Sequence, residues 1–369
     1  MPFPALSIII PCLNEAGTLP ALLADLKAQQ GVALDIVIAD GGSQDDTLAR
    51  CRPYAPVIIS TPRGRARQMN AGALKASGDD LLFLHADSKI RNPRLLATAL
   101  AHWRAAMDTA GHDRIAGHFP LRFMRSNMKH SVFFRYTEGK THFNRINTTN
   151  GDQGMLITRS FFESLNGFDE SQHFLEDQKL AEKIRADGRW ITLPGHLVTS
   201  GRRFETEGHH RRYILMSMLM ALHSTGYTTF FDRAADIYVP QDQTGFLPLT
   251  PYFTATVKMF VYDLGLMGSL RAWYRIGRYI RQNSWQMFYF FDVLFRTSKN
   301  KHGKPGGYPF LLFHDQYFGP ATSNAVCDAI NTFISFFWFM LVLAPFFLAA
   351  DSWHLLRALV CGRQKATQD

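Results

Sequence analysis

Short apolar runs recur through the first half of the chain, separated by stretches with a helical pattern. The runs lie at residues 6–10, 35–39, 57–60 and 81–84. Each run predicts a strand. The run at 81–84 is too short to cross a membrane and too continuous for a strand with one face in water, so it predicts a strand buried on both faces. Between the first two runs, Leu19, Leu22, Leu23 and Leu26 fall on one helical face, and residues 64–75 predict another helix. This alternation predicts a doubly wound, mostly parallel α/β sheet.

Acidic residues follow three of these predicted strands: Glu15, Asp40 and Asp87. Parallel strands end at the same edge of a sheet, and ligands bind at that edge in open α/β sheets. The run at 81–84 ends in His85-Ala86-Asp87, where a carboxylate can hold a divalent cation that grips phosphate oxygens. The sequence has no G-x-G-x-x-G after the first strand and no P-loop lysine, which excludes both of those nucleotide-binding motifs.

Residues 329–350 form a long apolar stretch without a charged residue. A helix needs ~20 such residues to cross the hydrocarbon core of a bilayer, so this segment is long enough. Pro345 predicts a kink near its end, which membranes tolerate. Positive charge beyond the segment, at Arg357, Arg363 and Lys365, leaves its orientation ambiguous. The pattern is compatible with a spanning, a re-entrant or a surface-lying segment.

A basic stripe precedes this segment. It consists of Arg271, Arg275, Arg278 and Arg281, at helical spacings of four, three and three. The opposite side of the same predicted helix carries Trp273, Ile276 and Ile280. A basic face opposite a Trp/Ile face is typical of a helix that lies in a membrane interface, which predicts a basic-aromatic interface region here.

The formal net charge of +9 favours a polyanionic partner, such as nucleic acid, an anionic membrane or a phosphorylated substrate. The arginines cluster beside apolar stretches rather than along a groove-binding motif, so no nucleic acid is expected. Four widely separated cysteines without metal-ligand spacing indicate reduced, cytosolic thiols. The first apolar run is short and no basic residue precedes it, so we interpret it as a strand rather than a signal peptide.

Several motifs occur in an order that resembles family 2 glycosyltransferases. They lie at residues 7–15, 36–43 with 46–47, 70–72 (Asn-Ala-Gly), 85–87 (His-Ala-Asp), 167–170 (Gly-Phe-Asp-Glu) and 176–177 (Glu-Asp). The resemblance covers roughly residues 5–205. It implies the GT-A fold, a Rossmann-like doubly wound and mostly parallel α/β sheet, and a nucleotide-diphosphate sugar as the donor.

The resemblance also implies roles for the residues at the sheet edge. The loop with Pro11, Asn14 and Glu15, together with Asp40 and the adjacent Gly41, would hold the nucleotide base and ribose. Asp87 would bind a divalent metal, Mn or Mg, on the diphosphate. The family's common pattern is Asp-x-Asp, and here His85 replaces the first acid, with Ala86 between them. Neutral imidazole can coordinate a metal or accept a hydrogen bond but adds no negative charge, so metal binding is expected to be weaker.

Further residues are expected on the donor side. Arg63, Arg65 and Arg67 precede Asn70, and although such a run is usually a solvated surface, Arg65 is the best placed to neutralise diphosphate charge. Asn70 belongs to the donor-side motifs. Arg202 and Arg203 lie where many relatives carry a basic-aromatic motif near the diphosphate, and either could contact phosphate.

The pair Glu176-Asp177 matches the acids that supply the general base in the resembling family. Asp177 would accept the proton of the acceptor hydroxyl during a direct displacement that inverts the anomeric carbon. Glu176 would raise the proton affinity of Asp177 by like-charge repulsion. The alternative is that both acids only stabilise the N-terminus of a helix.

These observations predict a membrane-associated, metal-dependent, inverting glycosyltransferase whose catalytic domain faces the cytoplasm. It would move a sugar to a lipid, lipid-linked or glycan acceptor. We expect a catalytic domain at 1–205, a helical membrane-interface region at 206–328, an apolar helix at 329–350 and a tail at 351–369. A nucleotidyltransferase on a similar sheet and a catalytically weakened membrane scaffold are the alternatives.

Overall fold

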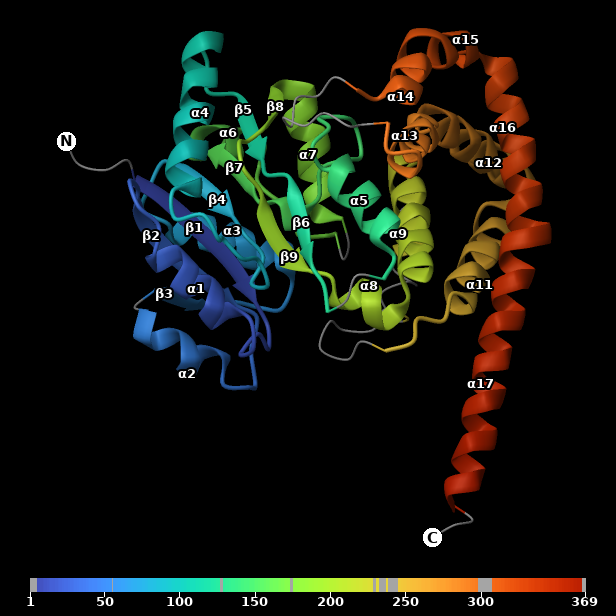
Figure 1. Ribbon diagram of the computed structural model, residues 1–369, viewed down its shortest axis with the longest axis horizontal. Coiled ribbons are helices and arrows are strands. Elements are labelled where there is room, and N and C mark those ends of the chain that lie inside the picture. The colour runs from blue at the N-terminus through green and yellow to red at the C-terminus, as the bar shows by residue number, and fades with distance from the viewer. Residues whose placement is uncertain are drawn as a thin grey trace. The chain divides into compact units, whose positions relative to one another are not determined.

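A computed structural model describes residues 5–54, 56–126, 129–172, 175–227, 230–231, 237, 245–297 and 307–366. The chain divides into two compact units, Met1–Arg202 and Arg203–Asp369 (Figure 1). The first unit holds the predicted sheet and the second is helical within its described residues. The fold is therefore α/β with a C-terminal helical region.

The strands of the first unit form a seven-stranded sheet and a separate two-stranded sheet. They are β1 (Ala5–Cys12), β2 (Ala33–Asp40), β3 (Val57–Ser60), β4 (Asp80–Phe83), β5 (Ile115–His118), β6 (Leu121–Met124), β7 (Met155–Thr158), β8 (Arg189–Thr192) and β9 (Leu197–Ser200). The large sheet has the order β3-β2-β1-β4-β7-β5-β8, and β6 pairs with β9. All pairs of the large sheet are parallel except those of β7, which runs antiparallel to β4 and β5. The mostly parallel sheet agrees with the prediction.

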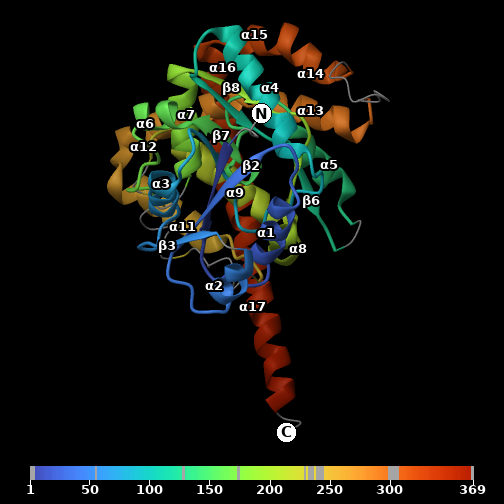
Figure 2. The same ribbon diagram turned by 90° about the vertical axis from the view of Figure 1, so that its left-hand side faces the viewer.

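Helices cover both faces of the large sheet. The helices of this unit are α1 (Leu19–Lys27), α2 (Thr47–Cys51), α3 (Arg65–Lys75), α4 (Leu95–Ala110), α5 (Ser131–Lys140), α6 (Arg159–Ser164) and α7 (Glu176–Asp187), with short 3₁₀ turns η1 (Arg52–Tyr54) and η2 (Gly151–Gln153). Ile8 and Ile10 pack with α1 and α4 on one face, whereas Ile9 packs with α3, α6 and α7 on the other. Figure 2 shows α1 and α3 on opposite sides of β2. Because β1 is buried on both faces, its sequence is continuously apolar rather than alternating.

Strand β1 is longer than the sequence predicts. The first apolar run predicts a strand at residues 6–10, but the strand continues through Pro11 to Cys12. β1 pairs with β4 only as far as Ile9 and with β2 as far as Cys12. One edge of β1 is therefore unpaired at Pro11, and a residue that lacks an N–H group is tolerated there.

The second unit is built from helices. They are α9 (His209–Ser224), α11 (Thr250–Lys258), α12 (Gly265–Gln282), α13 (Trp285–Leu294), α14 (Pro309–Phe313), α15 (Gly319–Thr322), α16 (Ala325–Phe337) and α17 (Ala344–Ala366), with π-helical segments η4 (Met259–Asp263), η5 (His314–Phe318) and η6 (Trp338–Leu343). The short helix α8 (Arg202–Glu207) lies where the two units meet in the sequence. Helices α16 and α17 join through η6 into a long rod at the right of Figure 1.

The prediction that the Trp273/Ile276 side of residues 271–281 faces a membrane is wrong in part. Trp273 and Ile276 are each only 8% exposed, because α12 packs this face against α16 rather than offering it to solvent. The Trp273 ring contacts Phe336 and Phe339 at centroid distances of 5.1 and 5.7 Å. The same Trp/Ile pattern thus occurs both in helices that lie in a membrane interface and in helices that pack on an apolar neighbour.

Candidate active site

The loops after β1 and β2 are joined by backbone-to-side-chain hydrogen bonds. The Asn14 N–H donates to Ser43 Oγ at 2.9 Å, and the Gln44 N–H donates back to Asn14 Oδ1 at 2.9 Å. The Glu15 N–H donates to Thr47 Oγ1 at 2.7 Å. Asn14 takes a left-handed φ of 55°, which asparagine tolerates better than most residues. The two strand ends therefore form one polar platform at the sheet edge.

Asp40 shapes this platform. It is 3% exposed, and its carboxylate accepts hydrogen bonds from the N–H of Gly42 at 3.1 Å, from the Ser43 hydroxyl at 2.5 Å and from Cys12 Sγ at 3.6 Å. The next residue, Gly41, donates its N–H to the Cys12 carbonyl at 3.0 Å. Asp40 thus holds the turn after β2, with contacts that are all internal to the protein.

The Asn70 motif also has partners inside the protein. The Asn70 amide donates to the Phe168 carbonyl and to Glu170, both at 2.9 Å, and its Oδ1 accepts from the Phe168 N–H at 3.0 Å. A Cβ at Gly72 would lie 2.5 Å from a methyl group of Ile9, so glycine allows α3 to sit directly on β1. These contacts tie α3 to the 167–170 loop and to the sheet, which accounts for two of the motifs structurally.

His85 follows β4 and meets a residue to which the sequence gave no role. Its Nδ1 lies 2.6 Å from Oδ1 of Asp152, which is in the 3₁₀ turn η2. The adjacent Ala86 is buried, and Asp87 is partly buried beyond it. The carboxylate absent from position 85 is therefore supplied next to it by Asp152, from a segment 67 residues away in the sequence.

The acidic surroundings change the pKa values of these groups. Burial raises the pKa of the Asp87 carboxyl, and the nearby Asp152 carboxylate raises it further. Burial and Arg65 act to lower the pKa of His85, but the hydrogen bond to Asp152 and its charge outweigh them, so this pKa is raised. The cluster disfavours its own negative charge, and a bound cation would relieve that repulsion.

Gly151 connects this cluster to Asp177. The Gly151 N–H donates to Asp177 Oδ2 at 2.5 Å. A Cβ on Gly151 would lie 2.7 Å from Nε2 of His85 and 3.2 Å from Asp177 Oδ2, so both side chains reach the same glycine. The turn is fixed by a capping box in which the side chains of Asn150 and Gln153 each accept a backbone N–H. His85 and Asp177 are thereby brought together although they are far apart in the sequence.

Asp177 and Glu176 begin α7. Glu176 is 3% exposed and forms an ion pair with Arg65 from the start of α3, with 3.3 Å between the Arg65 Nη1 and the Glu176 Oε1. Burial raises the pKa of Asp177, and the charge of Glu176 adds to the increase. Asp177 is partly buried, and a partly buried carboxyl group with a raised pKa is suited to act as a general base.

The two remaining predicted arginines, Arg202 and Arg203, lie in different surroundings. Arg202 acts on Glu15: burial and Asp87 raise the pKa of Glu15, whereas the positive charge of Arg202 acts to lower it. Arg202 and Asp87 are thus within electrostatic reach of Glu15. Arg203 instead forms an ion pair with Glu207 at 2.8 Å, one turn further along α8. The structure therefore associates Arg202 with the platform and gives Arg203 a helix-internal partner.

A metal ion at this edge would have few protein ligands. Within the described part of the chain, no group of three or more His, Cys, Asp and Glu side chains is arranged to hold a metal ion. A magnesium-type ion on a diphosphate needs only one or two carboxylates, because phosphate oxygens and water complete its coordination. Asp87 and the His85–Asp152 pair, with their mutual repulsion, fit such a site.

Gly151 offers a test of this arrangement. Gly151→Ala is expected to push the His85 ring or Asp177 aside, because the added methyl group would overlap Nε2 of His85. A shift of about 1 Å at a reacting group can cost ~10²-fold in rate, so turnover should fall far more than thermal stability. Gly17→Ala is the matched control, since a Cβ there meets nothing within 4 Å. Equal turnover in the two variants would show that the contact between Gly151 and His85 has no role.

Comparison with known proteins shows that part of the first unit is similar to glycosyltransferases. The sequence model of glycosyl transferase family 2 matches residues 7–165. A PGL/p-HBAD biosynthesis glycosyltransferase of Mycobacterium tuberculosis is 40% identical over 108 residues, which cover 27% of this chain and 42% of that protein. An uncharacterized glycosyltransferase of the same species is 32% identical over 134 residues, which cover 32% and 51% of the two chains. The chain thus spans about half or less of the length of these curated relatives.

Among solved structures, a mannosyltransferase from Pyrobaculum calidifontis in complex with GDP-Man and Mn2+ covers 92% of this chain and 89% of its own. The sequence identity is 16% and the TM-score 0.43, which is too weak a likeness to transfer any ligand. The family match, the sheet order and the polar edge agree with one another. Residues 7–165 therefore match glycosyl transferase family 2, and they lie on a mostly parallel α/β sheet with a polar edge.

Proposed function

We propose that the chain transfers a sugar from a nucleoside-diphosphate donor to a lipid or lipid-linked acceptor at a membrane, with inversion at the anomeric carbon. One observation carries this proposal: the turn at Gly151 links the cluster suited to a diphosphate-bound cation with the partly buried carboxyl group of Asp177. Donor activation and proton acceptance need to be adjacent for a direct displacement.

The reaction uses Asp177 as the base. The acceptor hydroxyl gives its proton to the Asp177 carboxylate while its oxygen bonds to the anomeric carbon, and the bond from that carbon to the diphosphate oxygen breaks. Each oxygen of Asp177 accepts one backbone N–H, from Gly151 at 2.5 Å and from Gln178 at 2.9 Å. These bonds fix the carboxylate and leave a lone pair on each oxygen for the proton.

On the donor side, Asp87 with His85 and Asp152 would hold a divalent cation, Mn or Mg. When bound, such an ion neutralises the charge that develops on the leaving diphosphate. Arg65 is 48% exposed at its side chain and is already oriented by Glu176, so its guanidinium can turn toward the same charge. Arg202 extends the positive potential toward Glu15. The loops at Asn14 and Asp40 would receive the nucleoside.

The membrane part of the proposal rests on the helical unit. Of the described residues, one helix, Ala325–Arg357, is long and apolar enough to cross a membrane, and only 11% of its most apolar window is buried. An exposed apolar helix on a sugar transferase supports a lipid acceptor held at the bilayer. The four cysteines and the family domain support a cytoplasmic catalytic unit.

The direct test is transfer by the purified full chain. Thermal shift with uridine and guanosine diphosphates, with and without manganese, first identifies the nucleotide, because stabilisation rises with affinity. The corresponding radiolabelled nucleotide sugars are then incubated with membrane lipid extract, and label in the organic phase is measured. Formation of a nucleotide sugar from a nucleoside triphosphate and a sugar phosphate would instead identify a nucleotidyltransferase.

Asp152→Asn is expected to weaken manganese-dependent diphosphate binding by ~10–100-fold, the usual effect of losing a residue that orients a metal ligand. The amide keeps the size of the side chain but removes its negative charge beside His85 and Asp87. Calorimetric titration of the diphosphate with and without manganese measures the effect. Unchanged manganese dependence would exclude Asp152 from the cation site.

A further inference from the structure

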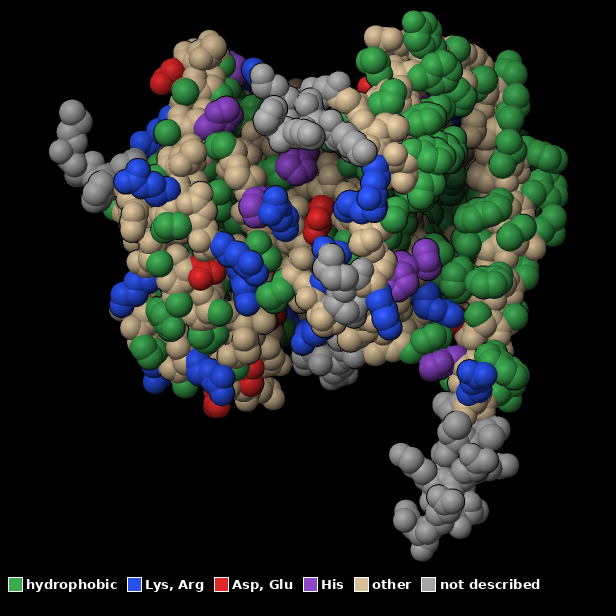
Figure 3. Space-filling model, in the orientation of Figure 1, with side chains coloured by type: hydrophobic (Ala, Val, Ile, Leu, Met, Phe, Trp, Pro, Cys, Tyr) green, Lys and Arg blue, Asp and Glu red, His purple; other side chains and the backbone are tan. Residues whose placement is uncertain are grey.

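The rod of α16, η6 and α17 exposes many apolar side chains along its length. Its exposed side chains are Val326, Ile330, Phe333, Ile334, Phe337, Trp338, Leu341, Val342, Phe346, Leu348, Trp353, Leu355 and Leu356. In Figure 3 hydrophobic side chains run along this rod and over α13 and α14. Ala325–Arg357 is about 50 Å long at 1.5 Å per residue, well over the ~30 Å of a bilayer's hydrocarbon core.

The two acidic residues of the rod, Asp328 and Asp351, face inward, whereas Arg357 near its end is exposed. Asp328 is buried and its Oδ1 lies 2.5 Å from Nε of Arg281 on α12. Asp351 is buried and its Oδ1 lies 2.5 Å from Nη1 of Arg211 on α9. The face turned away from the unit is therefore free of charge between these two ion pairs, and it is the surface that a lipid phase would contact.

A second stretch of chain runs antiparallel along the inner face. Thr250, at the start of α11, donates its hydroxyl to Asp351 at 2.6 Å, and Arg281, at the end of α12, pairs with Asp328. Between them Gly277 approaches so closely that a Cβ would lie 2.5 Å from the Thr332 nitrogen. Residues 250–281 therefore occupy the same length of the rod as residues 328–351.

This antiparallel stretch carries exposed charges. Lys258, Arg271, Arg275 and Arg278 are all exposed. The three arginines lie on the side of α12 roughly opposite the Trp273–Gly277 face that contacts α16, as their helical spacing requires. If the rod crossed a bilayer, these four cations would lie at hydrocarbon depth, where charged side chains are costly.

From this arrangement we infer that the rod does not cross the membrane: it lies in the plane of one leaflet, with its outer face among the acyl chains. This inference rests on the proposed membrane association and specifies its geometry. The inner face then packs on α12, and Arg271, Arg275 and Arg278 lie on the side of α12 away from the lipid, where Arg275 donates to the Thr225 carbonyl at 3.4 Å. A surface-lying helix buries its apolar face without burying any of these charges.

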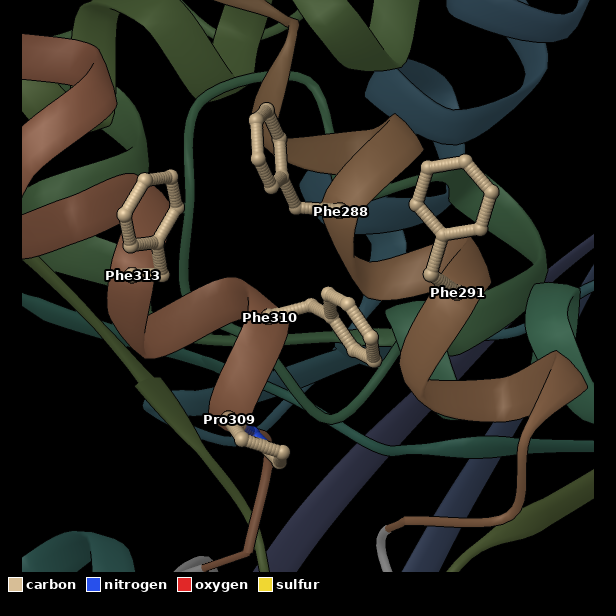
Figure 4. A pocket seen from close by; sticks show the side chains of 5 residues that line it. All are labelled: Phe288, Phe291, Pro309, Phe310 and Phe313. Atoms are coloured by element: carbon tan, nitrogen blue, oxygen red, sulfur yellow. The ribbon is translucent and has the colours of Figure 1, made fainter.

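An open apolar hollow adds to the lipid-facing surface. Its volume is about 550 Å³, and its lining consists of Phe288, Phe291, Pro309, Phe310 and Phe313. Figure 4 shows these rings around the space between α13 and α14. Leu312 and Tyr317, which lie close in the sequence to the lining residue Phe313, are also exposed. Bilayer acyl chains are the occupant that matches an all-apolar lining beside the apolar rod.

Thiol labelling tests the geometry on the full chain in sealed, inside-out membrane vesicles. The first variant carries Cys327→Ser and keeps Cys361 of α17 as its reactive thiol. The second variant carries Cys327→Ser and Cys361→Ser, and Ser323→Cys places its reactive thiol just before α16. Cys12 and Cys51 are buried and stay in both. An impermeant maleimide is expected to label both variants equally, with no gain on adding detergent. Labelling of one end only until detergent is added would overturn the inference in favour of a spanning helix.

Quenching of Trp338 by brominated lipids measures depth independently. Trp338 is 52% exposed on the outer face, near the middle of residues 329–350. The share of the fluorescence quenching that comes from Trp338 is the part that disappears in Trp338→Phe. For a rod in the plane of one leaflet, this share is expected to be greatest with bromines near the headgroups. A spanning rod requires it to be greatest with bromines near the ends of the acyl chains. A soluble dimer that ignores vesicles would also overturn the inference, because a second copy would then cover this face. Neither readout depends on sugar transfer, so a failure here is distinct from a failure of the proposed activity.

Discussion

Asp177→Asn is expected to lower the turnover number by ~10²–10⁴-fold, the usual contribution of a positioned general base. The amide keeps the shape of the side chain and can still accept the Gly151 N–H, but it cannot take a proton from the acceptor. Donor affinity should change little, because Asp177 acts on the acceptor. Turnover with saturating donor, together with calorimetric binding of the nucleoside diphosphate, separates the two effects.

The pH profile gives this prediction a second readout. A base works only when ionised, so the rate of the native enzyme should fall as pH drops through the pKa of Asp177. Burial and Glu176 raise that pKa, which moves the falling limb above the pH expected for an ordinary aspartate. The residual rate of Asp177→Asn should lack this limb.

Glu176→Gln is the matched control for Asp177→Asn. It removes the neighbouring charge and the partner of Arg65 while leaving the carboxylate of Asp177 in place. Its rate should fall less, and its acid limb should move to lower pH because the like-charge repulsion is gone. If Asp177→Asn keeps more than half of the native rate, or if Glu176→Gln is the more damaged variant, the base is not Asp177.

Much of the α/β sheet could be predicted because buried parallel strands leave a distinct sequence signal. Four apolar runs correspond to β1, β2, β3 and β4, although the ends differ by up to a few residues. The antiparallel insertion of β7 between β4 and β5 could not be predicted. Strand direction depends on how the chain returns to the sheet, and a four-residue buried run carries no record of it.

The candidate site was predicted one residue at a time, and what was missed is how residues pair. In the sequence, His85 stands where the Asp-x-Asp pattern has a carboxylate, so the pattern alone indicates that this carboxylate is lost. In the fold, the Asp152 carboxylate lies 2.6 Å from the His85 ring. The sequence motif assigned Asn70 to the donor side, whereas its amide donates hydrogen bonds to the Phe168 carbonyl and to Glu170. Such partners lie 67 to 100 residues apart, and periodicity reports only neighbours within a few turns.

The helical unit shows the same limit on a larger scale. The arginine spacing on α12 correctly predicted a basic stripe, and Arg271, Arg275 and Arg278 are exposed. The apolar side was assigned to lipid because no single-helix pattern reveals that α16 covers it. Amphipathicity indicates that a face is buried but not by what, and a protein neighbour and a membrane impose the same pattern.

Asp87→Ala is expected to abolish manganese-dependent binding of the nucleoside diphosphate, and His85→Ala to weaken it less. The reason is charge: Asp87 brings a full carboxylate to the cation, whereas His85 brings a ring whose Nδ1 is already engaged by Asp152. The Asp87 carboxyl has a pKa raised by burial and by Asp152, so removing it also relieves repulsion and should not destabilise the fold. Loss of binding without loss of thermal stability therefore isolates the metal role.

Calorimetric titration of the diphosphate, with and without manganese, decides between Asp87 and His85. Binding without metal should be similar in the native protein and both variants, because the platform at Asn14 and Asp40 is intact in each. With manganese, the native protein should gain affinity, His85→Ala should gain less and Asp87→Ala should gain nothing. An equal loss of the manganese-dependent affinity in both variants would make His85 a direct ligand of the ion. The ligand atom would then be His85 Nε2, which lies on the side of the ring toward Gly151. A full manganese response in Asp87→Ala would move the cation site away from this sheet edge altogether.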